Sequence, residues 1–380
     1  MEEISLLSQK GTVRIDSLLE EALEKEVFPG AALGVFFRGK PIVIRCRGYL
    51  SADKERSVSP QTVYDLASLT KVLATAPAVM QLVERGRINL NDSIREYFPA
   101  AGMEYGRIKI EHLLAHTSGL PAIVKLWKEI SSEENFRREE ALSFLLNLNP
   151  QRPPGVKVIY SDPNFLLLAY LIERVSGLSF AEYIRKNIIS HLNLSRTDFN
   201  PLKPPLQMSR EKIAPTEYCS WRERRPRGEV HDENCYFLGG ASGQAGLFSC
   251  LEDLHTLAEA LTPEKSKDGD ILSPASLSLM TGDRTGDGLK ARGLGWDISD
   301  GLNSSAGVYF GSSSIGHTGF TGTSLWHDPE RELTVILLSN RVYYGRENKQ
   351  IISLRPRLHN LIAAEVSRKN TFCFESGGSR

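Results

Sequence analysis

The pattern of apolar and polar residues predicts helices near both chain ends and in the middle of the chain. In residues 13–27, VRIDSLLEEALEKEV, apolar side chains recur at helical spacing, and Pro29 and Gly30 then form a stop signal. A similar pattern in residues 350–368, QIISLRPRLHNLIAAEVSR, predicts a closing helix. The middle of the chain carries three more such patterns: NFRREEALSFLLNL at 135–148, NFLLLAYLIERVSG at 164–177 and FAEYIRKNII at 180–189.

Strand-like segments lie outside this helical middle. Residues 31–50, AALGVFFRGKPIVIRCRGYL, contain two runs of strand composition around a short turn, which is typical of a hairpin. Three further strand-like segments follow near the C-terminus: GLGWDI at 293–298, TSLWHDP at 323–329 and ELTVILLSN at 332–340. This order predicts an α+β fold, in which an antiparallel sheet from both chain ends is flanked by helices and a mostly helical domain is inserted. We assign residues 1–93 and 262–380 to the sheet domain and residues 94–261 to the helical domain.

Composition narrows the class of protein. The 380 residues are 41% hydrophobic, which is enough for a large core, and 46 basic residues balance 46 acidic ones. This balance does not indicate a nucleic-acid partner or an anionic membrane surface, and no apolar run is long enough to span a bilayer. The N-terminus lacks the basic and apolar regions of a signal peptide, and the five cysteines are scattered without a C-x-x-C pair. We therefore expect a cytoplasmic location and no disulfide framework.

The motif S-x-x-K, a hydroxyl three residues before an amine, occurs three times. SADK (51–54) and SREK (209–212) lie in polar or proline-rich segments, where we expect both pairs to be solvated. SLTK (68–71) differs, because apolar residues follow it at helical spacing and indicate a helix that packs on a core. Pro77 interrupts this helix and is expected to kink it. Only the third copy has the setting of an active-site pair.

Ser68 and Lys71 can be a nucleophile and its base. Ser68 would lie at the helix N-terminus, where free N–H groups favour negative charge, and the i, i+3 spacing places Lys71 on the same face. Apolar neighbours would desolvate Lys71 and lower its pKa, so that it can accept a proton. The alternative is a capping serine beside a lysine that reaches solvent. These residues alone leave both interpretations open.

Two further segments add weight to the first interpretation. YSDPNFLLLAYLIE places Tyr160 and Asp162 just before an apolar helix, and SIGHTGFTG places His317, Thr318 and Gly319 at the entrance to a strand. In this order SLTK, YSD and HTG match the S-x-x-K, Y-x-N and K-T-G elements of the serine β-lactamase and penicillin-binding protein superfamily. The chain resembles the class C-like branch, which also holds esterases and D-amino-acid peptidases, over about residues 13–366. LLAHTSGLP (113–121) is another phrase typical of this branch.

The resemblance implies a role for each matching residue. Ser68 would attack the substrate carbonyl and form an acyl-enzyme, and Lys71 would take its proton. Tyr160 would relay a proton to the leaving group and then activate water; which of Lys71 and Tyr160 is the principal base stays open. The backbone N–H groups of Ser68 and Phe320, the latter on the strand after H-T-G, would form the oxyanion hole. His317 would hold an anionic substrate group and polarise the tyrosine.

Two departures from the family pattern predict poor activity on β-lactams. Asp162 stands where the pattern has asparagine, so it only accepts hydrogen bonds and would pair with Lys71 or with a cationic substrate group. His317 stands where many relatives have lysine, and a histidine is only partly charged near pH 7. Both changes should weaken the positioning of a lactam.

Other candidate ligands receive structural or minor roles. Residues 228–249, GEVHDENCYFLGGASGQAGLFS, resemble a subgroup linked to peptidoglycan fragments, but Gln244 stands where relatives carry histidine, so we expect no catalytic role for it. We retain His231 as a cleft residue. His112 and His116 have the i, i+4 spacing of zinc ligands, but the chain has no H-E-x-x-H and no evident third ligand. We expect no metal and no cofactor, and no G-x-S-x-G, Walker or Rossmann pattern is present.

The leading interpretation is a serine hydrolase that acts on a small-molecule or peptide-like substrate. D-amino-acid or muropeptide amides are the expected substrate class. A carboxylesterase or acyl transferase on the same scaffold is one alternative, because an acyl-enzyme can pass its acyl group to water or to an alcohol. A non-hydrolytic acyl-accepting sensor is the other, although a binder would not need Ser68, Lys71 and Tyr160 together. The sequence leaves the oligomeric state open.

Overall fold

A six-stranded antiparallel sheet is built from both ends of the chain. The computed structural model describes residues 8–131, 133–264, 271–301 and 303–375. The strand order β2-β1-β9-β8-β7-β6 joins an N-terminal hairpin to four C-terminal strands, and neighbouring strands are antiparallel. The strands are β1 (Gly30–Phe37), β2 (Lys40–Gly48), β6 (Asp297–Ile298), β7 (Ile315–Thr318), β8 (Ser324–Asp328) and β9 (Leu333–Ser339). The predicted α+β fold class is confirmed.

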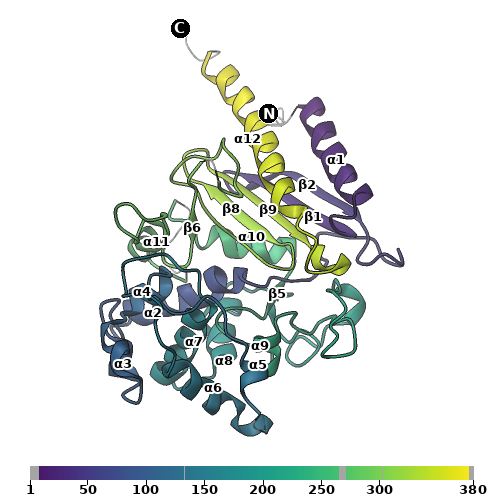
Figure 1. Cartoon of the computed structure of the whole chain (residues 1–380). Helices are drawn as coiled ribbons and strands as arrows, with labels where there is room; N and C mark the ends of the chain where they lie inside the picture. Colours follow the sequence, from purple (N-terminus) through teal and green to yellow (C-terminus); the bar gives the residue numbers. More distant parts are fainter. Residues whose placement is uncertain (1–7, 132, 265–270, 302, 376–380) are drawn as a thin grey trace.

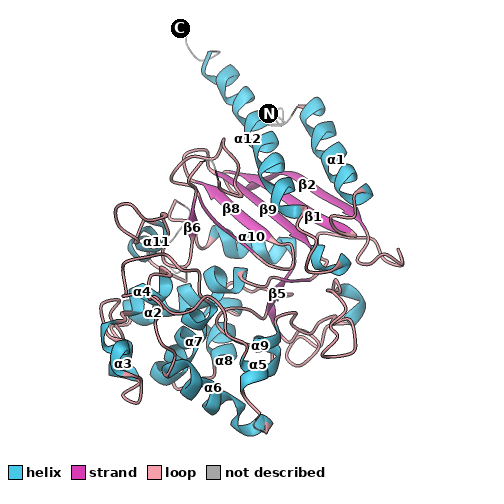
Figure 2. Cartoon of the chain, in the orientation of Figure 1, coloured by secondary structure: helices cyan, strands magenta, loops and turns pink. Residues whose placement is uncertain are grey.

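Helices cover both faces of this sheet (Figures 1 and 2). Successive side chains of β1 point to opposite faces. Ala31, Leu33 and Val35 belong to the cluster with α1 (Gln9–Glu24) and α12 (Ile351–Glu375), whereas alternate residues belong to the larger core. On the other face α10 (Leu251–Glu259) packs against β1 and β9. Because every residue of β1 and β9 is buried, these two strands form the centre of the sheet domain.

The hairpin between β1 and β2 follows from its turn residues. Arg38 has φ +53° and Gly39 has φ +75°, so both central residues of the two-residue turn are left-handed. This geometry matches the right-handed twist of the flanking strands, which pair Phe37 with Lys40 at the turn. The predicted hairpin is confirmed.

The segment between the sheet halves is mostly helical. Its small three-stranded sheet, ordered β3-β5-β4, comprises β3 (Tyr64–Asp65), β4 (Asp198–Phe199) and β5 (Leu247–Ser249). The helices are α2 (Ala76–Glu84), α3 (Ile94–Tyr97), α4 (Ile110–Leu114), α5 (Leu126–Glu129), α6 (Arg137–Leu146), α7 (Asp162–Ser176), α8 (Phe180–Ile184), α9 (Glu233–Phe237) and α11 (Pro274–Thr281). Shorter turns are the π turns Lys71–Thr75 and Arg185–Ile189 and the 3₁₀ turns Met103–Arg107, Glu134–Phe136, Arg210–Lys212 and Arg341–Tyr344. The proposed domain boundaries remain a prediction.

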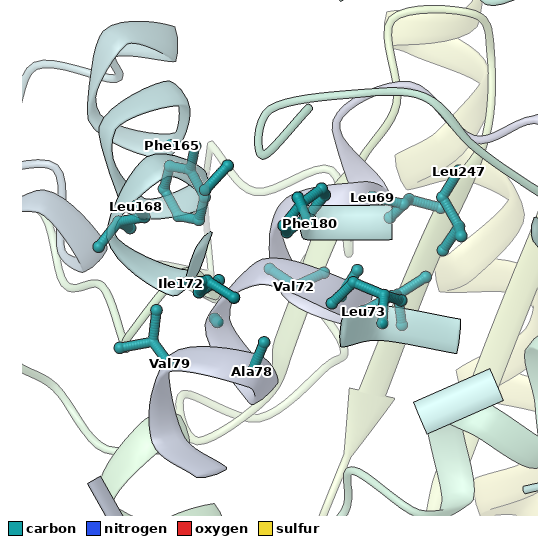
Figure 3. Packing of buried hydrophobic residues seen from close by; sticks show 14 of the residues in the cluster. Leu69, Val72, Leu73, Ala78, Val79, Phe165, Leu168, Ile172, Phe180 and Leu247 are labelled. Atoms are coloured by element: carbon teal, nitrogen blue, oxygen red, sulfur yellow. The ribbon is translucent and has the colours of Figure 1, made fainter. Parts of the chain in front are cut away.

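The helix that begins after Ser68 contains a π turn ahead of Pro77. The N–H of Ala76 donates to the carbonyl of Lys71, five residues back, so a wider turn accommodates the proline that a regular helix would exclude. Leu69, Val72 and Leu73 then face α7 and its neighbours, with the labelled side chains of Figure 3 forming one packed cluster. The apolar periodicity after Ser68 therefore serves the core, as predicted.

α7 is almost wholly buried and anchors this core. Its residues 163–172 are all buried, which fits its near-continuous apolar composition. No single helix among the described residues has the length and apolar composition to cross a membrane. α7 and the following residues 180–189 pass that test only as a pair, which is bent by 75°.

Candidate active site

Ser68 lies on a tight connection between β3 and the π turn. The preceding residue, Ala67, has φ +47°, a backbone conformation that residues other than glycine rarely adopt. Its N–H donates to Asp65 Oδ1 at 2.8 Å, and the N–H of His231 donates to Asp65 Oδ2 at 2.6 Å. Asp65 therefore holds the strained turn and connects it to His231, in the segment just before α9 that is called the 230s loop below. Ser68 is half-buried and lines a cavity.

Lys71 is fully buried, and three acceptors surround its ammonium. Nζ lies 3.1 Å from Ser68 Oγ, 3.0 Å from the carbonyl oxygen of Gln244 and 2.8 Å from Asp162 Oδ1. Burial lowers the lysine pKa, but the charges and hydrogen bonds of Asp162 and Tyr160 outweigh it and raise the pKa to about 12. The expectation that desolvation leaves Lys71 with a lowered pKa is therefore wrong, whereas the expectation that Asp162 pairs with Lys71 and raises its pKa is confirmed. The paired lysine is a cation at neutral pH.

Tyr160 stands over this pair, at the loop that leads into α7. Its side chain is 37% exposed, and the ring centroid lies 5.0 Å from Lys71 Nζ and 5.5 Å from the Arg292 guanidinium carbon. The His116 and His317 rings lie 4.5 and 5.7 Å from it. The structure thus brings Tyr160 and Asp162 to Ser68 and Lys71 from a segment about ninety residues away.

The two histidines with i, i+4 spacing serve separate local structures. His112 Nδ1 accepts the N–H of Lys109 at the start of α4, and His116 Nδ1 accepts the N–H of Ser161 beside the tyrosine. Burial holds the pKa of His116 well below its ordinary value, so its ring is neutral. Across the described residues no group of three histidine, cysteine or carboxylate side chains could hold a metal ion.

The His-Thr-Gly segment lies at the end of a strand. His317 and Thr318 are the last residues of β7, while Gly319 and Phe320 lie in the turn to β8. The expected entrance to a strand, and Phe320 on that strand, are therefore wrong. A Cβ on Gly319 would lie 2.1 Å from Thr323 Oγ1 and 2.4 Å from the carbonyl oxygen of Leu66, so only glycine lets this turn approach the nucleophile loop so closely.

His317 is buried and carries no charge near pH 7. Burial, followed by the positive charges of Arg292 and Lys71, holds its pKa well below the ordinary value. Nδ1 lies 2.9 Å from the carbonyl oxygen of Thr318, so the ring proton is on Nδ1 and is donated there. The expected partial charge is therefore wrong, and a neutral imidazole holds an anion even less firmly.

The turn that carries Phe320 is fastened from several sides. The hydroxyls of Thr321 and Thr323 donate to the carbonyls of Asp65 and Leu66 at 2.7 and 3.1 Å. The Phe320 ring lies between the His231 ring, at 5.5 Å, and the Arg341 guanidinium, at 4.6 Å. Arg341 Nε also donates to the Phe320 carbonyl at 2.9 Å. These contacts hold the Phe320 backbone at a constant position relative to Ser68.

A cavity of about 480 Å³ opens beside Ser68 and Tyr160, between the β7–β8 turn and the start of α12. His317, Thr318, Gly319 and Phe320 also line it. Its basic lining residues outnumber its one acidic residue, Asp297, and are Arg292, Arg341, Arg346, Lys349 and Arg355. Sequence reasoning missed these residues, because they are spread over more than sixty positions without a motif. Two of them are already paired, Arg292 with Asp297 and Arg346 with Glu217 and Glu233.

The other two S-x-x-K copies form no comparable pair. Ser51 is buried and donates to Asp53 Oδ1 at 2.6 Å, while Lys54 is exposed. Ser209 and Lys212 are both exposed, as expected. Neither serine lines the cavity. We expected all four side chains to be solvated; this is wrong for Ser51, which is buried, and right for Lys54, Ser209 and Lys212.

Comparisons with known proteins show what this chain is similar to. The family model described as "Beta-lactamase" matches residues 15–355. An "N-acetylmuramyl-L-alanine amidase" of Bacillus subtilis is 27% identical over 89% of this chain and 83% of its own length. A protein of Escherichia coli named "Putative D-alanyl-D-alanine carboxypeptidase" is 29% identical over 74% of this chain and 69% of its own length.

A solved structure shares the fold. The penicillin-binding protein homolog from Caulobacter crescentus superimposes with a TM-score of 0.72 at 19% sequence identity, covering 94% of this chain and 98% of that chain. At this level of identity the similarity concerns the fold alone. The family model matches most of the chain, and we conclude that this chain belongs to the beta-lactamase family of serine hydrolases.

Proposed function

We propose that this protein hydrolyses amide bonds of D-amino-acid or muropeptide type through an acyl-enzyme at Ser68. The observation that carries the proposal is the contact of Ser68 Oγ with the buried Lys71 ammonium, with Tyr160 in the wall of the same cavity. Relatives named as an amidase and a carboxypeptidase support an amide substrate. The basic cavity supports a leaving group that carries a carboxylate.

In the proposed acylation step, Tyr160 is the base. With a pKa of about 12, Lys71 is neutral in only about one molecule in 10⁵ at pH 7. Lys71 therefore stays a cation, donates to Ser68 Oγ and stabilises the Tyr160 phenolate. As Ser68 Oγ bonds to the carbonyl carbon, its proton passes to the phenolate oxygen. The oxyanion is held by the N–H groups of Ser68 and Phe320.

The same phenol then completes the cycle. Its proton passes to the leaving nitrogen as the C–N bond breaks, and the phenolate is regenerated. A water molecule next gives a proton to that phenolate while its oxygen attacks the acyl carbon, and the Ser68 oxygen leaves with the proton. The leaving amine occupies the cavity on the Tyr160 side, where Lys349 and Arg355 can hold its carboxylate in place of the neutral His317.

A substrate panel tests the proposal against its alternatives. The wild-type protein and the Ser68→Ala and Ser209→Ala variants would be incubated with a D-Ala-D-Ala peptide, a muramyl peptide and a p-nitrophenyl ester. We expect release of amine from at least one amide, which Ser68→Ala abolishes and Ser209→Ala, an exposed serine of the same motif, leaves unchanged. Turnover of the ester alone would indicate a carboxylesterase. A stable acyl-protein without turnover would indicate a sensor.

A further inference from the structure

A cluster of acceptor groups lies behind Lys71, away from the cavity described above. Asp162 pairs with Lys71, and Gln244 links Lys71 to Asp232; the Asn234 amide follows two residues after Asp232 along the chain, and none of these four residues lines the cavity. Gln244 joins Asp232 to Lys71, because its backbone carbonyl accepts from Lys71 Nζ and its side-chain Nε2 donates to Asp232 Oδ1 at 3.1 Å. One hydrogen bond thus separates Gln244 from Lys71, which in turn contacts Ser68.

Two buried oxygens of this cluster have no hydrogen-bond partner among the described residues. Gln244 is 1% exposed, and because its Nε2 is committed to Asp232, Oε1 is left unpaired. Asn234 is 7% exposed; its Nδ2 donates to the carbonyl of Val124 at 2.7 Å, and Oδ1 is left unpaired. A buried acceptor without a donor costs about 1–3 kcal/mol. Both side chains are fixed by their donated hydrogen bonds, and no group of the described chain donates to their oxygens.

The charges of the cluster leave one carboxylate without a cation. Lys71 is paired with Asp162 at 2.8 Å, whereas no salt bridge to Asp232 occurs in the described chain. Asp232 Oδ1 accepts only the N–H of Cys235 and the amide of Gln244. Burial and the nearby charge of Asp162 raise the pKa of Asp232 to about 6, which a bound cation would lower again. Nearby Glu233 is already paired with Arg346.

The position of the cluster relative to Ser68 indicates which part of a bound substrate would contact it. The leaving nitrogen must lie near the Tyr160 phenol, which lines the basic cavity. The acyl residue, on the other side of the scissile carbon, then lies toward Asp162 and Gln244. A group there that carries several N–H donors and one positive charge would satisfy the unpaired oxygens and balance Asp232 together.

We propose that this cluster binds the free α-ammonium group of the acyl residue, so that the protein acts on unblocked aminoacyl amides and short peptides in preference to N-acylated ones. This inference rests on the proposed acyl-enzyme function. An N-acetyl group removes the charge and two donors, so Asp232 and the amide oxygens of Asn234 and Gln244 would then face a partner that cannot pair with all of them. The acidic acyl side and the basic leaving-group side together suit a small zwitterionic peptide.

The test compares matched substrates that differ only at the amine. kcat/KM would be measured for D-alanine p-nitroanilide and its N-acetyl derivative, and for D-alanine methyl ester and its N-acetyl derivative. We expect the free amine to be favoured by about tenfold or more in both pairs, as a charge-assisted hydrogen bond predicts. A ratio of one or below in the wild-type protein would overturn the inference. If both anilides resist hydrolysis while the esters react, the proposed amidase function fails, and the ester pair still decides the inference.

Two variants assign the preference to the cluster. Asp232→Asn keeps Oδ1 for its two donors and removes the charge, so it should reduce the ratio severalfold toward one. Glu233→Gln removes the neighbouring charge, which faces Arg346, and should leave the ratio unchanged. An unchanged ratio in Asp232→Asn, or a preference that disappears when EDTA removes a divalent cation, would overturn the inference.

Discussion

Asp162 Oδ1 lies 2.8 Å from Lys71 Nζ, at a position where the family pattern has an asparagine. The lysine is fully buried and the aspartate is 21% exposed. An amide at this place would leave the ammonium with weaker compensation, whereas the carboxylate keeps it charged. Lys71 thus contacts both Asp162 and Ser68, and in the mechanism proposed above the role of base falls to Tyr160.

The pair should also stabilise the fold. Asp162→Asn leaves a buried cation without its anion, so we expect the free energy of unfolding at pH 7 to fall by about 3 kcal/mol. The folded pKa of Lys71 is raised above its ordinary value of 10.5; the contribution of the pair is therefore fully present below that pH and is lost as the pH rises through about 12. Urea denaturation of wild type and variant measures it. Glu211→Gln, which breaks an exposed pair with Arg56, should change stability by less than about 1 kcal/mol and is the control.

Ser68→Ala should remove hydrolysis and covalent labelling together. In the proposed mechanism the Ser68 oxygen bonds to the substrate carbonyl, so we expect a loss of several orders of magnitude, and further loss of Lys71 should add little. Intact-mass measurement with an activated ester reports acylation, and stopped assays report turnover. Near-wild-type turnover in Ser68→Ala would contradict the whole assignment.

Tyr160→Phe should separate catalysis from folding. The phenol is partly exposed and its ring packs on His116, so removal of one oxygen leaves packing intact. We expect an unchanged melting temperature and a loss of about 10²–10⁴ in kcat, as for removal of a general base. Tyr218→Phe, at a position 60% exposed, should leave kcat unchanged. If Tyr160→Phe keeps wild-type kcat, Tyr160 has no proton-transfer role.

The protein should be a poor β-lactamase. Asp162 cannot donate to the carbonyl of a lactam side chain, and the neutral His317 gives little attraction to the lactam carboxylate. We expect kcat/KM for a chromogenic cephalosporin to lie below that for a short-chain p-nitrophenyl ester. A cephalosporin value of about 10⁶ M⁻¹s⁻¹ or more that also exceeds the ester value would show the expectation to be wrong.

Local patterns in the sequence were enough to predict several elements. Strand composition and helical apolar spacing located the β1–β2 hairpin and the long α7 helix, and the i, i+3 spacing placed Ser68 and Lys71 on one face, because each depends on residues within a few positions of one another. The resemblance of three ordered motifs then predicted that Tyr160 and His317 would join this pair. In the structure the Tyr160 ring lies 5.0 Å from Lys71 Nζ, and the His317 ring lies 5.7 Å from the Tyr160 ring.

Only the tertiary structure decided the charges of the site. The pKa of Lys71 depends on Asp162, and that of His317 depends on burial and on Arg292; neither contact is encoded in neighbouring positions. The basic cavity likewise collects side chains from β-strand turns and α12, and the acceptor cluster joins residues from α7 and the 230s loop. Electrostatic interactions act through space and depend on desolvation, so packing of distant segments sets them, whereas spacing along the chain sets only which residues share a helix face.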